Sequence, residues 1–139
     1  MTGHDANPHR PTPSADGEAP LSVAILRQGD YLIASIQSDL SDSEVVALRD
    51  ELSQLVGRFR TRGVIVDVTA MDVIDSFVAR SLRSIAITAR LRGADMIVVG
   101  IRPDVAIAMV QFDLNLDALR TALDLDEALA VLDGSTHVG

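Results

Sequence analysis

Apolar residues near the start of the foldable chain follow the pattern of two β-strands. Residues 21–28 and 31–37 are rich in apolar and β-branched side chains, and Gly29-Asp30 separates the two runs. Two residues of this kind between β-type runs are typical of a tight hairpin turn. The pattern therefore predicts an antiparallel pair of strands.

Helical spacing follows the hairpin. Ser41 and Glu44 have the separation of a capping box, in which each side chain bonds the other residue's backbone N–H. Apolar residues then recur every three or four positions, which predicts an amphipathic helix over 42–61. We expect Gly63 to end this helix.

The second half of the chain alternates short apolar runs with helical segments. Residues 64–68 and 96–99 are almost wholly apolar, as in strands that are covered on both faces. Helical spacing between them predicts a helix over 76–91, closed at Gly93. Three further elements are predicted: a helix from Pro103 to about residue 112, a short edge strand over 118–121, and a last helix from a cap at Asp124 to Leu132.

This order of elements predicts an α/β fold. Strands that alternate with helices imply βαβ crossovers, so we expect a small, mainly parallel sheet opened by an antiparallel hairpin. With so few short strands, the helices are expected to pack largely on one face. Residues 1–20 are predicted to be a disordered tail, residues 21–133 one domain, and residues 134–139 a short C-terminal tail.

Composition narrows the range of functions. The 139 residues carry a net charge of −8, with twelve arginines and no lysine, which argues against binding to nucleic acid or to an anionic membrane. Cysteine is absent, and His4, His9 and His137 all lie near the ends of the chain. We therefore expect a protein that is not an enzyme and has no cofactor or metal site. The absence of a signal peptide and of a long apolar run predicts a cytoplasmic protein.

Ser76 is the main candidate for chemistry. It stands at the predicted start of the helix over 76–91, with carboxylates at Asp72 and Asp75 on the approach. Its hydroxyl can cap the helix, or it can accept a phosphate where the helix dipole favours negative charge. Asp75 can support a backbone N–H of the first turn or help to recruit a kinase.

The residues that follow Ser76 are candidates for binding a partner. Arg80 and Arg83 lie on roughly the same side of the predicted helix as Ser76, where they either pair with a phosphate, dock an acidic partner or form a solvated face. Phe77 is either a core residue or an exposed anchor. Asp67 lies in an apolar strand, so we expect it at the strand's end or in hydrogen bonds.

Several separated motifs resemble the STAS domain family of bacterial anti-sigma factor antagonists. The order of elements, the segment VIVDVTAMDVIDS and the helix start at Ser76 carry this resemblance. DVIDSFVARSL and GIRP are similar to the branch of RsbS-type stressosome scaffolds. The resemblance implies a SpoIIAA-like fold over nearly all of the foldable chain.

The resemblance also implies partners and a mechanism. The chain would form dimers and a large homo- or hetero-oligomer with STAS-domain sensor paralogues of the RsbR type. This assembly would hold a switch serine/threonine kinase, which would leave after phosphorylating Ser76. A phosphatase would reset the site. The sensor paralogues carry a second phosphorylatable residue where this chain has Ala108, which favours the scaffold role.

Three alternatives stay open at this point. The first is a simple monomeric or dimeric antagonist that binds an anti-sigma factor kinase. The others are a small ligand-binding domain or enzyme, which the missing histidines and cysteines disfavour, and a regulatory domain of a transporter.

Overall fold

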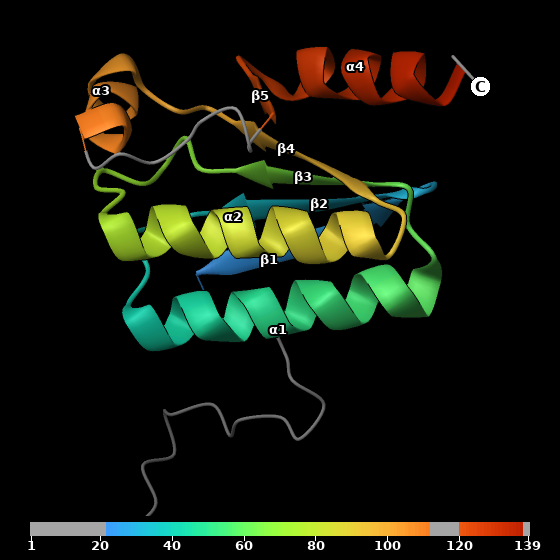
Figure 1. The fold of residues 1–139 in the computed structure, drawn as a ribbon, viewed down its shortest axis with the longest axis horizontal. Coiled ribbons are helices and arrows are strands. Elements are labelled where there is room, and N and C mark those ends of the chain that lie inside the picture. Colours follow the sequence, from blue (N-terminus) through green and yellow to red (C-terminus); the bar gives the residue numbers. More distant parts are fainter. Residues whose placement is uncertain (1–21, 112–119, 138–139) are drawn as a thin grey trace, which may run out of the picture.

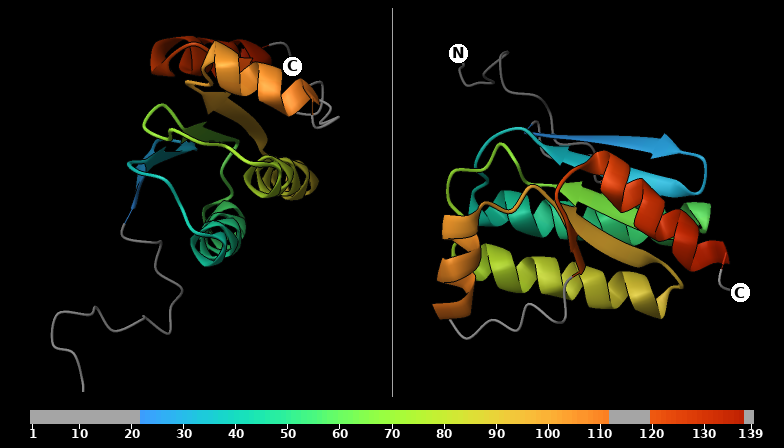
Figure 2. Two further views of the ribbon diagram at one scale, coloured as in Figure 1. Left: turned by 90° about the vertical axis from the view of Figure 1, so that its left-hand side faces the viewer. Right: turned by 90° about the horizontal axis from the view of Figure 1, so that it is seen from above.

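A five-stranded sheet with helices on both faces forms the molecule (Figures 1 and 2). The computed structural model describes residues 22–111 and 120–137. The strands are β1 (Val23–Gln28), β2 (Tyr31–Ile36), β3 (Gly63–Asp67), β4 (Asp95–Val99) and β5 (Arg120–Ala122). The helices are α1 (Asp42–Phe59), α2 (Ser76–Leu91), α3 (Pro103–Gln111) and α4 (Leu125–His137).

The strands lie in the sheet in the order in which they occur in the chain. β1 pairs antiparallel with β2, and every later neighbour pairs parallel. Gln28 pairs with Tyr31 across the predicted two-residue turn, where Gly29 has a φ of 58°. Turns that match the twist of a hairpin need such positive φ values, which glycine adopts without steric cost. The predicted hairpin and mainly parallel sheet are both confirmed.

Helix α1 begins where the capping box predicts and ends earlier than expected. The backbone N–H of Ser41 donates to Glu44 Oε1 over 2.9 Å, and the side chain of Ser41 accepts from the N–H of Glu44. At the other end Arg60, not Gly63, caps the helix in the left-handed conformation, with a φ of 51°. Gly63 as the helix terminator was wrong, because this glycine is the first residue of β3 and is buried.

Two apolar clusters lie on the two faces of the sheet. The larger joins α1 and α2 to one face, and includes Leu48, Leu82 and Val66. The smaller joins α4 to the other face, through Leu132 and Ile65 among others. The two long helices thus share one face as expected, whereas α4 lies across the opposite face, which is plain in the side view (Figure 2).

The last elements follow the prediction closely. Pro103 is the first residue of α3, and β5 is an edge strand two residues later than expected. Asp124 Oδ1 accepts from the N–H of Glu127 over 2.9 Å, so it caps α4, which continues beyond Leu132 to His137. The predicted N-terminal tail and the residues at 112 and 118–119 lie outside the described part. Within that part, no helix has both the length and the apolar character needed to span a bilayer.

Candidate functional site

Three connections meet at one end of the sheet, where the parallel strands finish. They are the connection from β2 to α1, residues 68–75 between β3 and α2, and the turn from β4 to α3 (Figure 1). Open α/β sheets commonly carry their functional groups at this end. Residues 68–75, which we call the acceptor loop, lead directly to Ser76.

Asp67 immediately precedes the acceptor loop and shapes its first turn. It is the last residue of β3, and its Oδ1 accepts from the N–H of Thr69 over 2.9 Å and from Thr69 Oγ1 over 2.6 Å. Both parts of the expectation are confirmed, since the carboxylate lies at the strand's end and is hydrogen-bonded. Asp67 therefore has a structural role in presenting the loop.

Two charged side chains from other connections hold the middle of the acceptor loop. Asp39 Oδ1, which precedes α1, accepts from the N–H groups of Asp72 and Val73 over 2.8 and 3.3 Å. From the other side, Arg102 Nη2 donates to the carbonyl of Met71 over 3.2 Å and to Asp72 Oδ1 over 3.0 Å. Charge-assisted bonds of this kind are stronger than neutral ones. Asp72 is thus held through its backbone by Asp39 and through its side chain by Arg102.

Gly100 allows the turn after β4 to approach the acceptor loop. Its φ is +85°, and a Cβ built on it would lie 1.9 Å from Thr69 Oγ1 and 3.0 Å from Thr69 Cα. The backbone N–H of Val68 also donates to the carbonyl of Val99 over 2.9 Å. Only glycine satisfies both the backbone conformation and the close approach. The turn therefore fixes Arg102 directly beside the loop.

Asp75, and not Ser76, caps helix α2. The Asp75 carboxylate accepts from the N–H of Val78 over 2.9 Å, and Ser76 is the first helical residue. The interpretation of Ser76 as the cap was wrong, because the residue before it supplies the acceptor. Ser76 is half-buried, and its hydroxyl makes no hydrogen bond to any residue that the structure describes. The hydroxyl is thus left at a helix N-terminus, where the dipole favours an anion.

Removing the cap gives a test of this assignment. We expect Asp75→Ala to lower the free energy of unfolding by about 1 kcal/mol, because a first-turn N–H loses its acceptor. Asp75→Asn keeps an acceptor oxygen and should lose much less. Urea denaturation of both variants, with Ser76→Ala as the comparison, measures the difference. A larger loss for Ser76→Ala than for Asp75→Ala would contradict the assignment.

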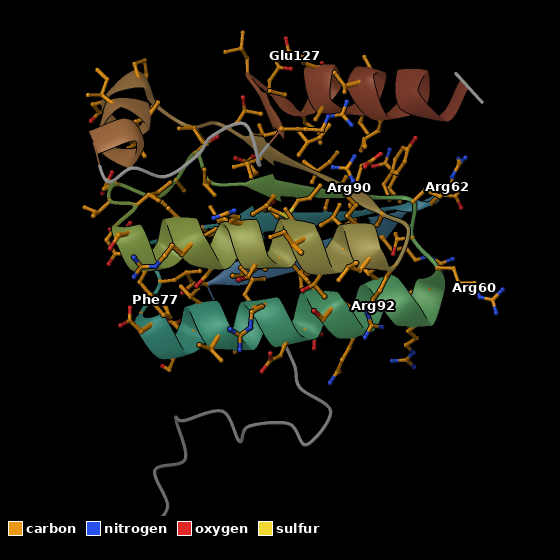
Figure 3. The ribbon with its side chains drawn as sticks, viewed as in Figure 1. Arg60, Arg62, Phe77, Arg90, Arg92 and Glu127 are labelled. Carbon is orange, nitrogen blue, oxygen red and sulfur yellow. The ribbon has the colours of Figure 1, made fainter. Side chains whose placement is uncertain are left out.

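The other candidate residues are divided between the surface and the core. Arg80 and Arg83 are exposed on the outward side of α2, and Asp72 is exposed while paired with Arg102. Phe77 is partly buried and packs against the larger core cluster, at the N-terminal end of α2 (Figure 3). The structure therefore places Asp72, Asp75 and Ser76 at one loop, with the two arginines along the helix that follows.

Sequence reasoning missed Asp39 and Arg102. Each follows the end of a predicted strand, and the carboxyl ends of parallel strands meet at one edge. That signal was available, but neither residue was singled out. In the described part of the chain, no group of three or more His, Cys, Asp or Glu side chains is arranged to hold a metal ion.

Comparisons with known proteins agree with this arrangement. The STAS domain model matches residues 22–128. RsbS from Moorella thermoacetica, solved as a serine-to-glutamate variant, is 32% identical with a TM-score of 0.75, over 83% of this chain and 97% of that chain. A chain of the stressosome, described as a signal integration and transduction hub, is 30% identical with a TM-score of 0.68, over 81% of this chain and 98% of its own.

A sequence relative points in the same direction. The RsbT co-antagonist protein RsbRA of Bacillus subtilis (strain 168) is 28% identical over 82 residues, which are 59% of this chain and 30% of RsbRA. The chain therefore spans less than a third of that relative. Together these matches confirm the resemblance on which the sequence interpretation relied.

Proposed function

Because the chain belongs to the STAS domain family and is similar to the stressosome protein RsbS, we propose that it is a phosphorylatable scaffold of a stressosome-type assembly. In this proposal it holds a switch serine/threonine kinase and releases it when Ser76 is phosphorylated. The scaffold role is non-enzymatic. STAS-domain sensor paralogues complete the assembly, and a phosphatase resets Ser76.

One observation carries the proposal. Ser76 is the first residue of α2, yet the cap is supplied by Asp75, so the serine hydroxyl is not needed to satisfy the helix start. A half-buried hydroxyl in this position can be reached by a kinase with little change in the fold. The acceptor loop before it is held from both sides by Asp39 and Arg102. A fixed loop presents the acceptor in one geometry, which lowers the entropic cost of the reaction.

The proposed chemistry is an ordinary phosphoryl transfer. A bond forms between Ser76 Oγ and the γ-phosphorus of ATP, the bond from that phosphorus to the bridging oxygen breaks, and ADP leaves. The hydroxyl proton passes to a base of the kinase. The scaffold supplies the acceptor and its position, and the partner supplies the catalytic groups.

The consequence of the transfer is electrostatic. A phosphoserine adds about −1.5 to −2 charges and three acceptor oxygens. The charge would stand beside the carboxylates of Asp72 and Asp75 and before Arg80, one helical turn away. A kinase surface that fits the unmodified loop would then meet repulsion and a desolvation cost. A tenfold loss of affinity needs only about 1.4 kcal/mol.

Phosphorylation by the cognate kinase tests the proposal. We expect Ser76→Ala to stay folded, to keep binding the kinase, and to lose its ability to release it. Ser76→Asp should weaken capture of the kinase. The measurements are mass spectrometry of the modified residues after incubation with kinase and ATP, and surface-plasmon binding of each variant.

Ser84 provides the matched control. It is exposed on the outward side of the same helix, so Ser84→Ala should leave phosphorylation and release unchanged. Ser81 is a second control, because it is buried and should stay unmodified. Modification confined to Ser84, Ser81 or Ser41, or an unmodified protein, would overturn the proposal. Size measurement with the sensor paralogues separates a large assembly from a simple antagonist.

A further inference from the structure

The outward face of α2 carries a stripe of basic and apolar side chains. This basic stripe consists of Arg80, Arg83, Ile87, Arg90 and Leu91, which fall on the side of the helix opposite its buried residues. Helix α2 contains no acidic residue, although the chain has a net charge of −8. None of the three arginines forms an ion pair with a described residue, and the side chains of Ile87 and Leu91 are 49% and 83% exposed.

A small hollow adjoins the basic stripe. Ile87 and Arg90 form one wall, Met96 contributes to the apolar lining, and the ion pair between Asp95 and Arg120, 3.8 Å long, lies at its side. Its volume is about 60 Å³. This space suits one apolar side chain from a partner and is too small for a typical organic ligand, whose pocket is several hundred Å³.

The opposite face of the molecule carries a patch of complementary character. This acidic patch consists of Leu123, Asp124, Leu125, Asp126 and Glu127, at the end of β5 and the start of α4. Leu123 is 82% exposed and Leu125 36%. Four carboxylates and no basic residue occur between positions 124 and 133. The patch therefore offers exposed leucines surrounded by negative charge.

We infer that the basic stripe of one molecule binds the acidic patch of a second copy of this chain. Helices α2 and α4 lie on opposite faces of the sheet, so the two surfaces cannot meet within one molecule (Figures 2 and 3). An exposed leucine of the patch enters the hollow, and the carboxylates pair with the arginines of the stripe. A polyanion such as nucleic acid is disfavoured as occupant, because the acidic chain repels it at long range.

The contact is heterologous, since two different surfaces meet. Such contacts repeat from one molecule to the next and generate rings or extended assemblies. One face of the helix is about 22 Å long at 1.5 Å per residue and about 10 Å wide, so its area of roughly 220 Å² is small beside the roughly 800 Å² per partner of a standard interface. Association is therefore weak between two molecules and strengthens when many contacts act together. The inference rests on the scaffold part of the proposed function.

Charge reversal tests both surfaces. The stripe variant combines Arg83→Glu with Arg90→Glu, and the patch variant combines Asp126→Arg with Ala130→Arg, an exposed neighbour one turn along α4. These positions avoid the side chains of Asp124 and Glu127, which bond the backbone at the start of α4. Sedimentation velocity over a range of protein concentrations gives the size of the particles.

The matched control places the same charge change elsewhere. Arg49→Glu with Arg58→Glu reverses two arginines of α1, outside the stripe. We expect the wild type and this control to associate as concentration rises, and to dissociate as salt is added. The stripe and patch variants should stay monomeric.

Mixing the two reversed variants is the sharpest measurement. The basic stripe of the patch variant still fits the acidic patch of the stripe variant, and the reversed stripe, now acidic, fits the reversed patch, now basic. A 1:1 mixture should therefore associate again as concentration rises, although each variant alone stays monomeric. Restored pairing also shows that both variants are folded.

Four outcomes would overturn the inference: a wild type that stays monomeric, reversed variants that associate normally, a control that behaves like the stripe variant, or a mixture that does not pair. If the outward face of α2 instead binds a different acidic protein, the wild type should stay monomeric and the mixture should not pair. The phosphorylation of Ser76 is measured separately with the kinase. If self-association fails while Ser76 is still phosphorylated, only this inference fails. If self-association occurs while Ser76 is not phosphorylated, only the phosphorylation part of the proposed function fails.

Discussion

Gly100→Ala is expected to destabilise the protein and to release the acceptor loop together. Alanine at a φ of +85° is strained by about 1–2 kcal/mol. Its Cβ would also lie 1.9 Å from Thr69 Oγ1, a contact that requires the loop to move. Overpacking of this kind typically costs a further 1–3 kcal/mol. The displaced loop should lose its bonds to Asp39 and Arg102.

Gly93→Ala is the matched control for this prediction. Gly93 has a φ of +90°, but nothing lies within 4 Å of the position that its Cβ would take. It therefore carries the backbone strain without the collision. Urea denaturation gives the two free energies of unfolding, and amide hydrogen exchange at Asp72 and Val73 reports the loop. Equal losses for the two variants, with unchanged exchange, would show that the approach to Thr69 is not tight.

Gly63 and Leu132 are expected to show strong energetic coupling. A Cβ on Gly63 would lie 2.8 Å from Leu132 Cδ1 and 3.0 Å from Tyr31 Cδ1, so Gly63→Val overfills the contact between β3 and α4. Its cost should be about 1–3 kcal/mol. Leu132 is 1% exposed, and Leu132→Ala should cost about 2–5 kcal/mol, because it leaves a cavity.

The double variant tests whether the cost of Gly63→Val comes from the contact with Leu132 or from the backbone preference at position 63. In the presence of Leu132→Ala, the valine at position 63 enters the vacated space, so the double variant should be more stable than the sum of the single losses predicts, by more than 0.5 kcal/mol. Strict additivity in a urea-denaturation cycle would contradict the contact. Val131, half-buried in the same helix, gives a control: Val131→Ala should combine additively with Gly63→Val.

Local signals explain why the order of elements could be predicted. The capping box at Ser41, the two-residue hairpin turn and Pro103 at a helix start act over a few residues, and each is readable without the fold. The end of α1 could not be located in this way. Arg60 adopts a conformation that glycine favours, while Gly63 is required for a contact with α4, far away in the sequence.

The candidate site was predictable in part for the same reason. Asp72, Asp75 and Ser76 are neighbours in the chain, so a motif brings them to notice together. The bonds from Asp39 and Arg102 span about thirty residues each, and they depend on the order of strands in the sheet. Whether Asp75 or Ser76 caps α2 depends on one residue of register, which spacing alone does not resolve.

The attachment of α4 has a practical consequence. Tyr31 is the only tyrosine of a chain without tryptophan, and it is buried at the start of β2 in the cluster that packs against α4. Its hydroxyl donates to Asp133 of that helix. The intrinsic ultraviolet emission of the protein therefore comes from the seam between β2 and α4. Detachment of the last helix is therefore expected to change this emission, which can be followed in real time without any dye.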